Sequence, residues 1–107
     1  MSEIALVYVL YGTRPAAEVA ARTMVAQRLA ACANVFAQGQ SFYQWAGALE
    51  AVTEVAVLFK TAPARCDALM AALERDHPYE LPAILSWRVT ARPAYAAWVE
   101  RETASQP

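Results

Sequence analysis

The chain has 107 residues, a length that suits one domain over residues 1–107, because compact domains usually contain about 100 to 200 residues. A formal net charge of -1 and the lack of a lysine- and arginine-rich segment argue against a nucleic-acid partner. Hydrophobic residues make up 58% of the chain and charged residues 18%, which predicts more apolar surface than a small monomer can bury, and hence an oligomer.

The N-terminal segment MSEIALVYVLYGTRP carries an apolar run that predicts a first strand over residues 4–11, ended by residues 12–15. The run lacks a preceding basic region and is far shorter than the roughly 20 residues that span a bilayer. We therefore expect a cytoplasmic protein with no membrane partner. In that compartment Cys32 and Cys66 are expected to stay reduced.

Residues 15–31 predict a first helix, because this stretch contains no glycine and no interior proline. Glu18 and Arg22 are spaced to form an i,i+4 ion pair on its polar side. The predicted apolar face consists of Val19, Thr23, Ala26 and Ala30.

Two strand-like runs, residues 36–45 and 48–61, flank the dipeptide Ala46-Gly47. Glycine takes the positive φ that a tight hairpin turn requires, so the two runs predict a long β-hairpin. Side chains alternate between the two faces of a strand, and one face of the second run predicts the core. That face contains Thr53, Val55, Val57 and Phe59.

A second helix is predicted to begin at residues 61–63 and to end at His77, because a residue before proline is driven out of the helical region. Residues 82–90 predict another strand, and a last helix follows from Pro93. The predicted core face of the second helix consists of Cys66, Leu69, Met70 and Leu73.

The element order is strand, helix, strand, strand, helix, strand and a C-terminal helix. A hairpin between two crossover units predicts an α+β fold of the ferredoxin-like split βαβ type, with an antiparallel sheet and its two helices on one face. The other face is left bare. We expect the last helix or neighbouring subunits to cover it.

His77 is the only histidine, and two interpretations of it stay open. It either closes the helix end by binding a backbone carbonyl, or it is a site residue together with Tyr79 and Glu80 on a rigid, proline-bracketed turn. A zinc or copper ion usually takes three or four ligands, so a metal site needs a second subunit. No nucleophile is paired with His77, and we therefore expect no enzymatic activity.

Glu54 and Lys60 lie on the same face of the predicted strand but roughly 20 Å apart, which excludes an ion pair within one chain. Each is either solvated separately or meets groups from other segments or subunits. Tyr43 and Trp45 share a strand face just before the turn. Exposed aromatic side chains at a hairpin tip predict packing against a neighbouring chain.

Three motifs carry a family resemblance in the order in which they occur: LAACANV, SFYQWAGALEAVTEVAVLFKT and HPYELP. Over a span from about Tyr8 to Trp98 the chain resembles the CutA family, the divalent-cation tolerance proteins. The resemblance implies a ferredoxin-like subunit in a PII-like homotrimer, in which long hairpin strands extend the sheets of adjacent subunits. It also implies tolerance to copper and other divalent ions and a pocket between subunits.

By motif position, the resemblance implies which residues serve the pocket and a metal, and it implies no required cofactor. The expected ligand-binding residues are Trp45, Glu54, Lys60, His77 and Tyr79. His77 and Cys32 are the expected ligands of a divalent metal ion, copper or zinc.

Two positions depart from the family pattern. Ala83 stands where relatives usually carry glutamate, and Gly12 stands where some relatives carry cysteine. The leading hypothesis is a non-enzymatic homotrimer that binds a divalent metal ion or a small anion between its subunits. The alternative is a PII-like regulatory or structural adaptor that engages a protein partner.

Overall fold

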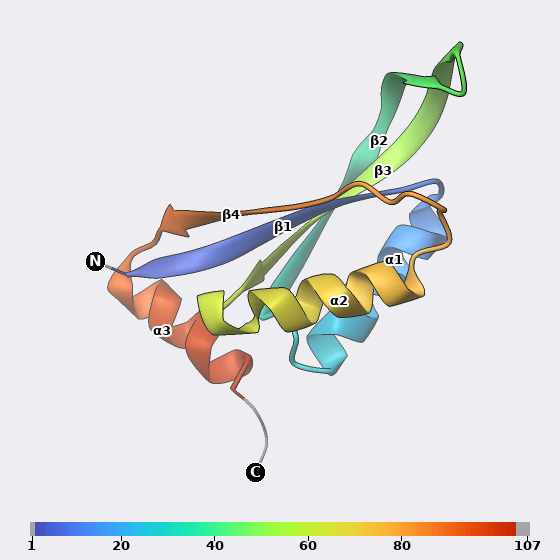
Figure 1. The fold of residues 1–107 in the computed structure, drawn as a ribbon. Helices are drawn as coiled ribbons and strands as arrows, with labels where there is room; N and C mark the ends of the chain where they lie inside the picture. The colour runs from blue at the N-terminus through green and yellow to red at the C-terminus, as the bar shows by residue number, and fades with distance from the viewer. Residues whose placement is uncertain (1, 105–107) are drawn as a thin grey trace.

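The computed structural model describes residues 2–104 and contains a four-stranded sheet with three α-helices. The strand order is β2-β3-β1-β4 and every neighbouring pair is antiparallel (Figure 1). The predicted α+β, ferredoxin-like order is therefore confirmed. None of the helices within residues 2–104 is both long and apolar enough to cross a membrane. The elements are β1 (Glu3–Tyr11), α1 (Arg14–Ala26), β2 (Cys32–Trp45), β3 (Ala48–Thr61), the 3-10 helix η1 (Pro63–Arg65), α2 (Cys66–Asp76), β4 (Ile84–Thr90) and α3 (Pro93–Glu102).

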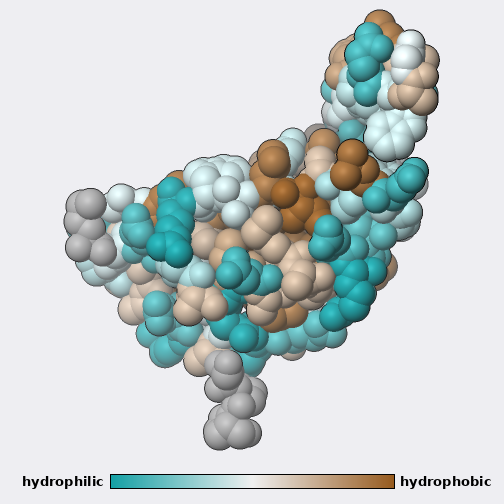
Figure 2. All heavy atoms as spheres, viewed as in Figure 1, coloured by the Kyte–Doolittle hydropathy of each residue, from teal (hydrophilic) through white to brown (hydrophobic). Residues whose placement is uncertain are grey.

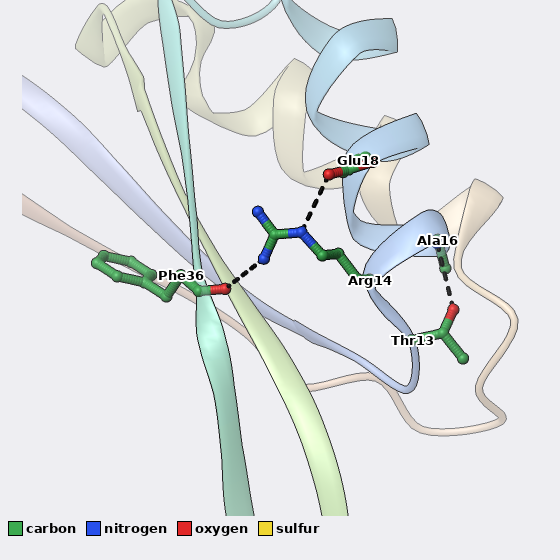
Figure 3. Close-up of polar contacts among 5 residues, drawn as sticks. All are labelled: Thr13, Arg14, Ala16, Glu18 and Phe36. Carbon is green, nitrogen blue, oxygen red and sulfur yellow. Dashed lines mark hydrogen bonds and ion pairs between the residues drawn. The ribbon is translucent and has the colours of Figure 1, made fainter.

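Helix α1 begins with a side-chain cap and a contact to the hairpin. The Thr13 hydroxyl accepts the backbone N–H of Ala16 at 3.3 Å, which satisfies one of the free donors of the first turn (Figure 3). The Arg14 guanidinium donates to Glu18 Oε2 at 3.1 Å and to the carbonyl of Phe36 at 3.3 Å. The expected pairing of Glu18 with Arg22 is therefore wrong, because Arg14, one turn earlier, occupies the carboxylate.

The end and the buried face of α1 also differ from the prediction. The helix stops at Ala26 because Arg28 takes a left-handed conformation with φ of 60°, and the N–H groups of Leu29 and Ala30 both bind the Met24 carbonyl. Val19, which was expected to face the core, is 65% exposed. Alanine occurs on all sides of this helix, so the spacing of apolar residues predicted its buried face poorly. The buried residues of α1 are Ala17, Ala21 and Met24.

The main core lies between the sheet and the pair of helices α1 and α2. Val55, Val57 and Phe59 of β3 are fully buried, which confirms the predicted core face, whereas Thr53 lies beyond the end of β1 and is exposed. Cys66 is half-buried at the edge of this core. Other buried members are Val7, Val9, Tyr11, Leu69 and Leu73.

Helix α3 covers only one end of the opposite sheet face. Val99 of α3 is fully buried in a second cluster that contains Ile4 at the start of β1. Farther along the same face, Leu85 is 56% exposed and Trp87 45% exposed on β4. Figure 2 shows hydrophobic surface gathered near the base of the projecting hairpin. Residues 2–104 therefore leave most of this sheet face without a covering layer.

The β2–β3 hairpin projects far beyond the rest of the sheet, and the molecule measures 46 × 27 × 22 Å (Figure 1). Strand β1 ends at Tyr11, opposite Val55, so the outer part of the hairpin has only two strands. The register of β2 shifts between Val35 and Gln38, where the strand is irregular. The exposed hydrophobic residues of the outer hairpin are Phe42, Tyr43, Trp45 and Leu49.

The hairpin turn yields a stability prediction. Ala46 has φ of 51° and Gly47 φ of 83°, and a left-handed conformation costs alanine roughly 1 kcal/mol. The variant Ala46→Asn should stabilise the protein by about 0.5 to 1 kcal/mol, since asparagine tolerates this conformation. The measurement is the urea midpoint at fixed protein concentration. Gly47→Ala places a second alanine in a left-handed conformation and should lower the midpoint. A loss of stability in Ala46→Asn contradicts the assignment.

Candidate functional site

His77 occupies the junction between α2 and the loop that leads to β4. It is 8% exposed, and its Nε2 lies 2.7 Å from the carbonyl oxygen of Leu10 at the end of β1. Its Nδ1 accepts the backbone N–H of Tyr79 at 3.1 Å. A carbonyl oxygen only accepts, so Nε2 carries the proton and the ring is the neutral tautomer. Both ring nitrogens are occupied, and His77 must give up one of these bonds before it can bind a metal.

Tyr79 links this loop to the hairpin. Its hydroxyl donates to Glu54 Oε2 at 3.0 Å, and its ring meets the His77 ring edge-on with centroids 4.7 Å apart. Burial first, and then the hydrogen bond to the Glu54 carboxylate, raise the pKa of Tyr79 to about 12. The phenol therefore stays protonated at neutral pH and remains a hydrogen-bond donor to the carboxylate.

Glu54 is a buried carboxylate that forms no ion pair with any cationic group among residues 2–104. The residue is only 6% exposed, and the Tyr79 hydroxyl is its side-chain hydrogen-bond donor. The ion pairs found among residues 2–104 involve other carboxylates, those of Glu18, Glu102 and Asp76. Buried charges in proteins are generally paired or coordinate metals. Among the side chains of this region, Glu54 is therefore the one that a cation from outside the chain would stabilise most.

The other expected site residues lie elsewhere along the sheet. Lys60 is directly opposite Cys32 on the neighbouring strand, and Glu54 is six residues away on β3, roughly 20 Å. Trp45 lies next to the hairpin turn, opposite Ala48, also roughly 20 Å from Glu54. The chain therefore brings together Glu54, His77 and Tyr79, and leaves Lys60, Cys32 and Trp45 apart from them.

The two expected metal ligands are not neighbours in one chain. His77 binds the carbonyl of Leu10, whereas Cys32 lies beside Lys60, which pairs with Leu6. Four residues of β1 separate these positions, roughly 13 Å. Within residues 2–104 no group of three or more His, Cys, Asp or Glu side chains is placed to hold a metal ion. A shared metal would need ligands from more than one subunit.

Comparison with known proteins gives the family. A family model described as CutA1 divalent ion tolerance protein matches residues 5–102. The chain belongs to the CutA1 divalent ion tolerance protein family. This assignment confirms the resemblance carried by the three sequence motifs.

The CutA1 assignment is supported by relatives and by solved structures. A CutA homolog from Xenopus laevis is 40% identical over 80 residues, 74% of this chain and 53% of that protein. The divalent-cation tolerance protein CutA of Pyrococcus horikoshii is 32% identical over 99 residues, 92% of this chain and 96% of that protein. The crystal structure of CutA1 from Ehrlichia chaffeensis matches with a TM-score of 0.92 at 29% identity, over 98% of this chain and 99% of that one. The chain spans about half the length of the vertebrate relatives it matches.

Sequence reasoning missed two residues that shape the site of this CutA1 family member. Tyr11 stacks on His77 with ring centroids 4.6 Å apart and an interplanar angle of 18°. Gly12 leaves room for Tyr79, because a Cβ at this position would lie 3.0 Å from the Tyr79 hydroxyl. The sequence signal for Gly12 was its departure from the family cysteine. Tyr11 had no signal beyond its place at the end of an apolar strand.

The contact at Gly12 gives a prediction about the hydroxyl of Tyr79. Gly12→Ala should push Tyr79 away from Glu54 and lower the free energy of unfolding by about 1 kcal/mol. The measurement is urea unfolding. Gly39→Ala is the matched control, since a Cβ there meets nothing within 4 Å.

A double-mutant cycle separates this effect from general strain. In a Tyr79→Phe background the hydroxyl is absent, so Gly12→Ala should cost clearly less than in the parent protein. The same cost in both backgrounds would show that the contact with the hydroxyl is irrelevant.

The raised pKa of Tyr79 predicts a loss of stability at alkaline pH. The pKa is near 10 in the unfolded chain and about 12 in the folded one, so the stabilisation is fully present below pH 10 and declines as the pH rises toward 12. The urea midpoint should therefore fall less between about pH 9 and pH 11 in Tyr79→Phe than in the parent protein. An identical fall in both proteins contradicts the prediction.

Proposed function

We propose that the protein is a non-enzymatic homotrimer that supports divalent-cation tolerance and binds a metal ion or a small anion between its subunits. The observation that carries the proposal is Glu54, a buried carboxylate with a phenol donor and no cationic partner in the part of the chain that the structure describes. A divalent cation or a basic side chain from a neighbouring subunit completes its environment. Lys60 of a second copy, half-buried on the same sheet face, is the candidate for that side chain.

The outer hairpin supports assembly into an oligomer. A two-stranded hairpin is marginally stable on its own in water, and this one exposes Phe42 and Leu49 at 69% each. The exposed Leu85 and Trp87 on the open sheet face need cover as well. Hairpin strands that extend a neighbour's sheet would stabilise the hairpin and cover the exposed sheet face, because they add backbone hydrogen bonds and bury apolar area.

The site residues that the chain leaves apart belong to this assembled pocket. Glu54 and Tyr79 stand near the base of the hairpin, whereas Lys60 and Cys32 stand at the other end of the same strands and Trp45 near the tip. In a cyclic trimer one end of a subunit meets a different part of the next subunit. Trp45, Lys60 and Cys32 can thereby reach the Glu54 region of a neighbour.

His77 acts in this proposal through the residues that it positions. Its ring holds the Tyr79 backbone in place, and Tyr79 holds Glu54. A direct metal contact by His77 and Cys32, with copper or zinc as the ion, remains a proposal that requires ligands from two subunits. We also propose a cytoplasmic location, which the free thiols of Cys32 and Cys66 support.

Native mass spectrometry of protein purified gently from its source, without added metal or chelator, tests the proposal. The expected result is a trimer that carries a fixed additional mass, which identifies the metal ion or small molecule. A bare trimer shifts the function to a regulatory adaptor with a protein partner. A monomer contradicts the assembly on which the pocket depends.

Titration with copper(II), zinc and phosphate then tests the role of Glu54. Glu54→Gln removes the buried charge and should weaken cation binding by about tenfold or more. Glu50→Gln is the matched control, because Glu50 lies on the same face of β3, four residues closer to the hairpin turn. A combined Lys60→Ala and His77→Ala variant should weaken binding further; unchanged affinities in all variants would refute the site.

A further inference from the structure

A groove between α1 and α2 lies on the helix side of the sheet, opposite the open face. Its volume is about 390 Å³, within the lower part of the range of roughly 300 to 1,000 Å³ that small-molecule pockets occupy. Ala16 and Ala20 lie one turn apart on α1 and keep the space hollow. Met24 of α1 and Leu73 of α2 complete apolar walls, and Val19 stands at the exposed rim.

Three residues that line this apolar groove carry polar side-chain groups, Tyr11, Thr23 and Asp76, and the unpaired phenol and the carboxylate among them give it a chemical preference. Tyr11 lines it, is only 3% exposed, and its hydroxyl has no hydrogen-bond partner among the described residues. Asp76, at the end of α2, is the charged residue among those that line the groove. Burial, followed by the negative charge of Asp76, raises the pKa of Tyr11 to about 12, so the phenol is neutral at physiological pH, and both residues line the same groove.

The Asp76 carboxylate keeps capacity for a further partner. Within residues 2–104 its ion-pair partner is the adjacent Arg75, at 3.0 Å, and the Asp76 and Arg75 side chains are 49% and 67% exposed. Exposed ion pairs of this kind are weak, because water screens both charges. A carboxylate also accepts several hydrogen bonds, so Arg75 does not saturate it.

We propose that this groove binds a small organic ammonium ion with an apolar body. The body lies along Ala16, Ala20 and Leu73, and the ammonium group donates hydrogen bonds to the Asp76 carboxylate and to the hydroxyl oxygen of Tyr11. An organic anion is repelled by Asp76, and a pure hydrocarbon leaves the Tyr11 hydroxyl without a partner. The combination of one negative charge, one unpaired hydroxyl and apolar walls selects the amine.

The groove is independent of the pocket proposed between subunits. Its lining residues belong to a single chain and lie on the helix side, so assembly through the open sheet face leaves it accessible. It does contact the same ring stack, because Tyr11 packs on His77. Since His77 is the only histidine, its ring signals report on the groove without overlap from other histidines.

Titration with 2-phenylethylamine, followed by NMR of the His77 ring protons, tests the proposal on the full chain. The amine should bind and shift these signals, 2-phenylethanol should bind more weakly, and phenylacetate should not bind at the same concentrations. Asp76→Asn should weaken the amine about tenfold, toward the affinity of the alcohol. Glu74→Gln, an exposed charge on the same helix outside the groove, should leave it unchanged.

Ala20→Leu fills the groove from α1 and should abolish binding of both the amine and the alcohol. Equal affinities for amine and phenylacetate, or amine binding that survives Ala20→Leu, would overturn the proposal. The order of the three ligands on the unmodified protein decides the charge preference even where a variant folds poorly. The variant Glu54→Gln tests the site between subunits and should not change amine binding in the groove. A failure of one proposal is therefore distinguishable from a failure of the other.

Discussion

The His77 ring joins three parts of the structure that are distant in sequence. It binds the Leu10 carbonyl at the end of β1, holds the backbone N–H of Tyr79 in the loop after α2, and stacks on Tyr11. The two hydrogen bonds satisfy partly buried backbone groups, and the stacking covers the buried Tyr11 ring, at an edge of the sheet where an unpaired polar group is costly. The position of Tyr79, and through it the hydrogen bond to Glu54, depends on this ring. The structural and the functional interpretations of His77 are therefore compatible, since it supports the site by fixing its neighbours.

The sheet is incomplete in two respects, and both favour an oligomer over a monomer. Strand β1 stops opposite Val55 while β2 and β3 continue to the turn, so the outer hairpin lacks a third strand. Helix α3 covers only the end of the sheet near Ile4, and Trp87 stays exposed. A ferredoxin-like sheet with one bare face gains stability when copies cover each other, because apolar area and strand edges are buried together. The pocket proposed between subunits rests on these two unsatisfied surfaces.

The two binding proposals occupy opposite sides of the same ring stack. Tyr79 binds Glu54 of the hairpin on one side, whereas Tyr11 lines the groove between the helices on the other. Each place contains one polar group without its usual partner. Among the described residues, Glu54 has no cationic partner and the Tyr11 hydroxyl has no hydrogen-bond partner. A buried polar group without a partner raises the free energy of the folded protein, and this is the physical basis for assigning a ligand to each place.

The sequence by itself determined the order of elements, the hairpin turn and the core face of β3. Glycine at the turn, prolines at helix starts and strict alternation are local signals, and local geometry follows from them directly. It also singled out His77 as the only histidine, Tyr79 as its neighbour on a rigid turn, and Glu54 by its strand face, and the family motif then implied a shared pocket for them. The tertiary structure decided which face of α1 is buried, because alanine on all sides left its rotation to the packing against the sheet. It likewise decided that His77 meets Tyr11, 66 positions earlier by the numbering, since contacts between distant segments arise only once the sheet and helices have packed.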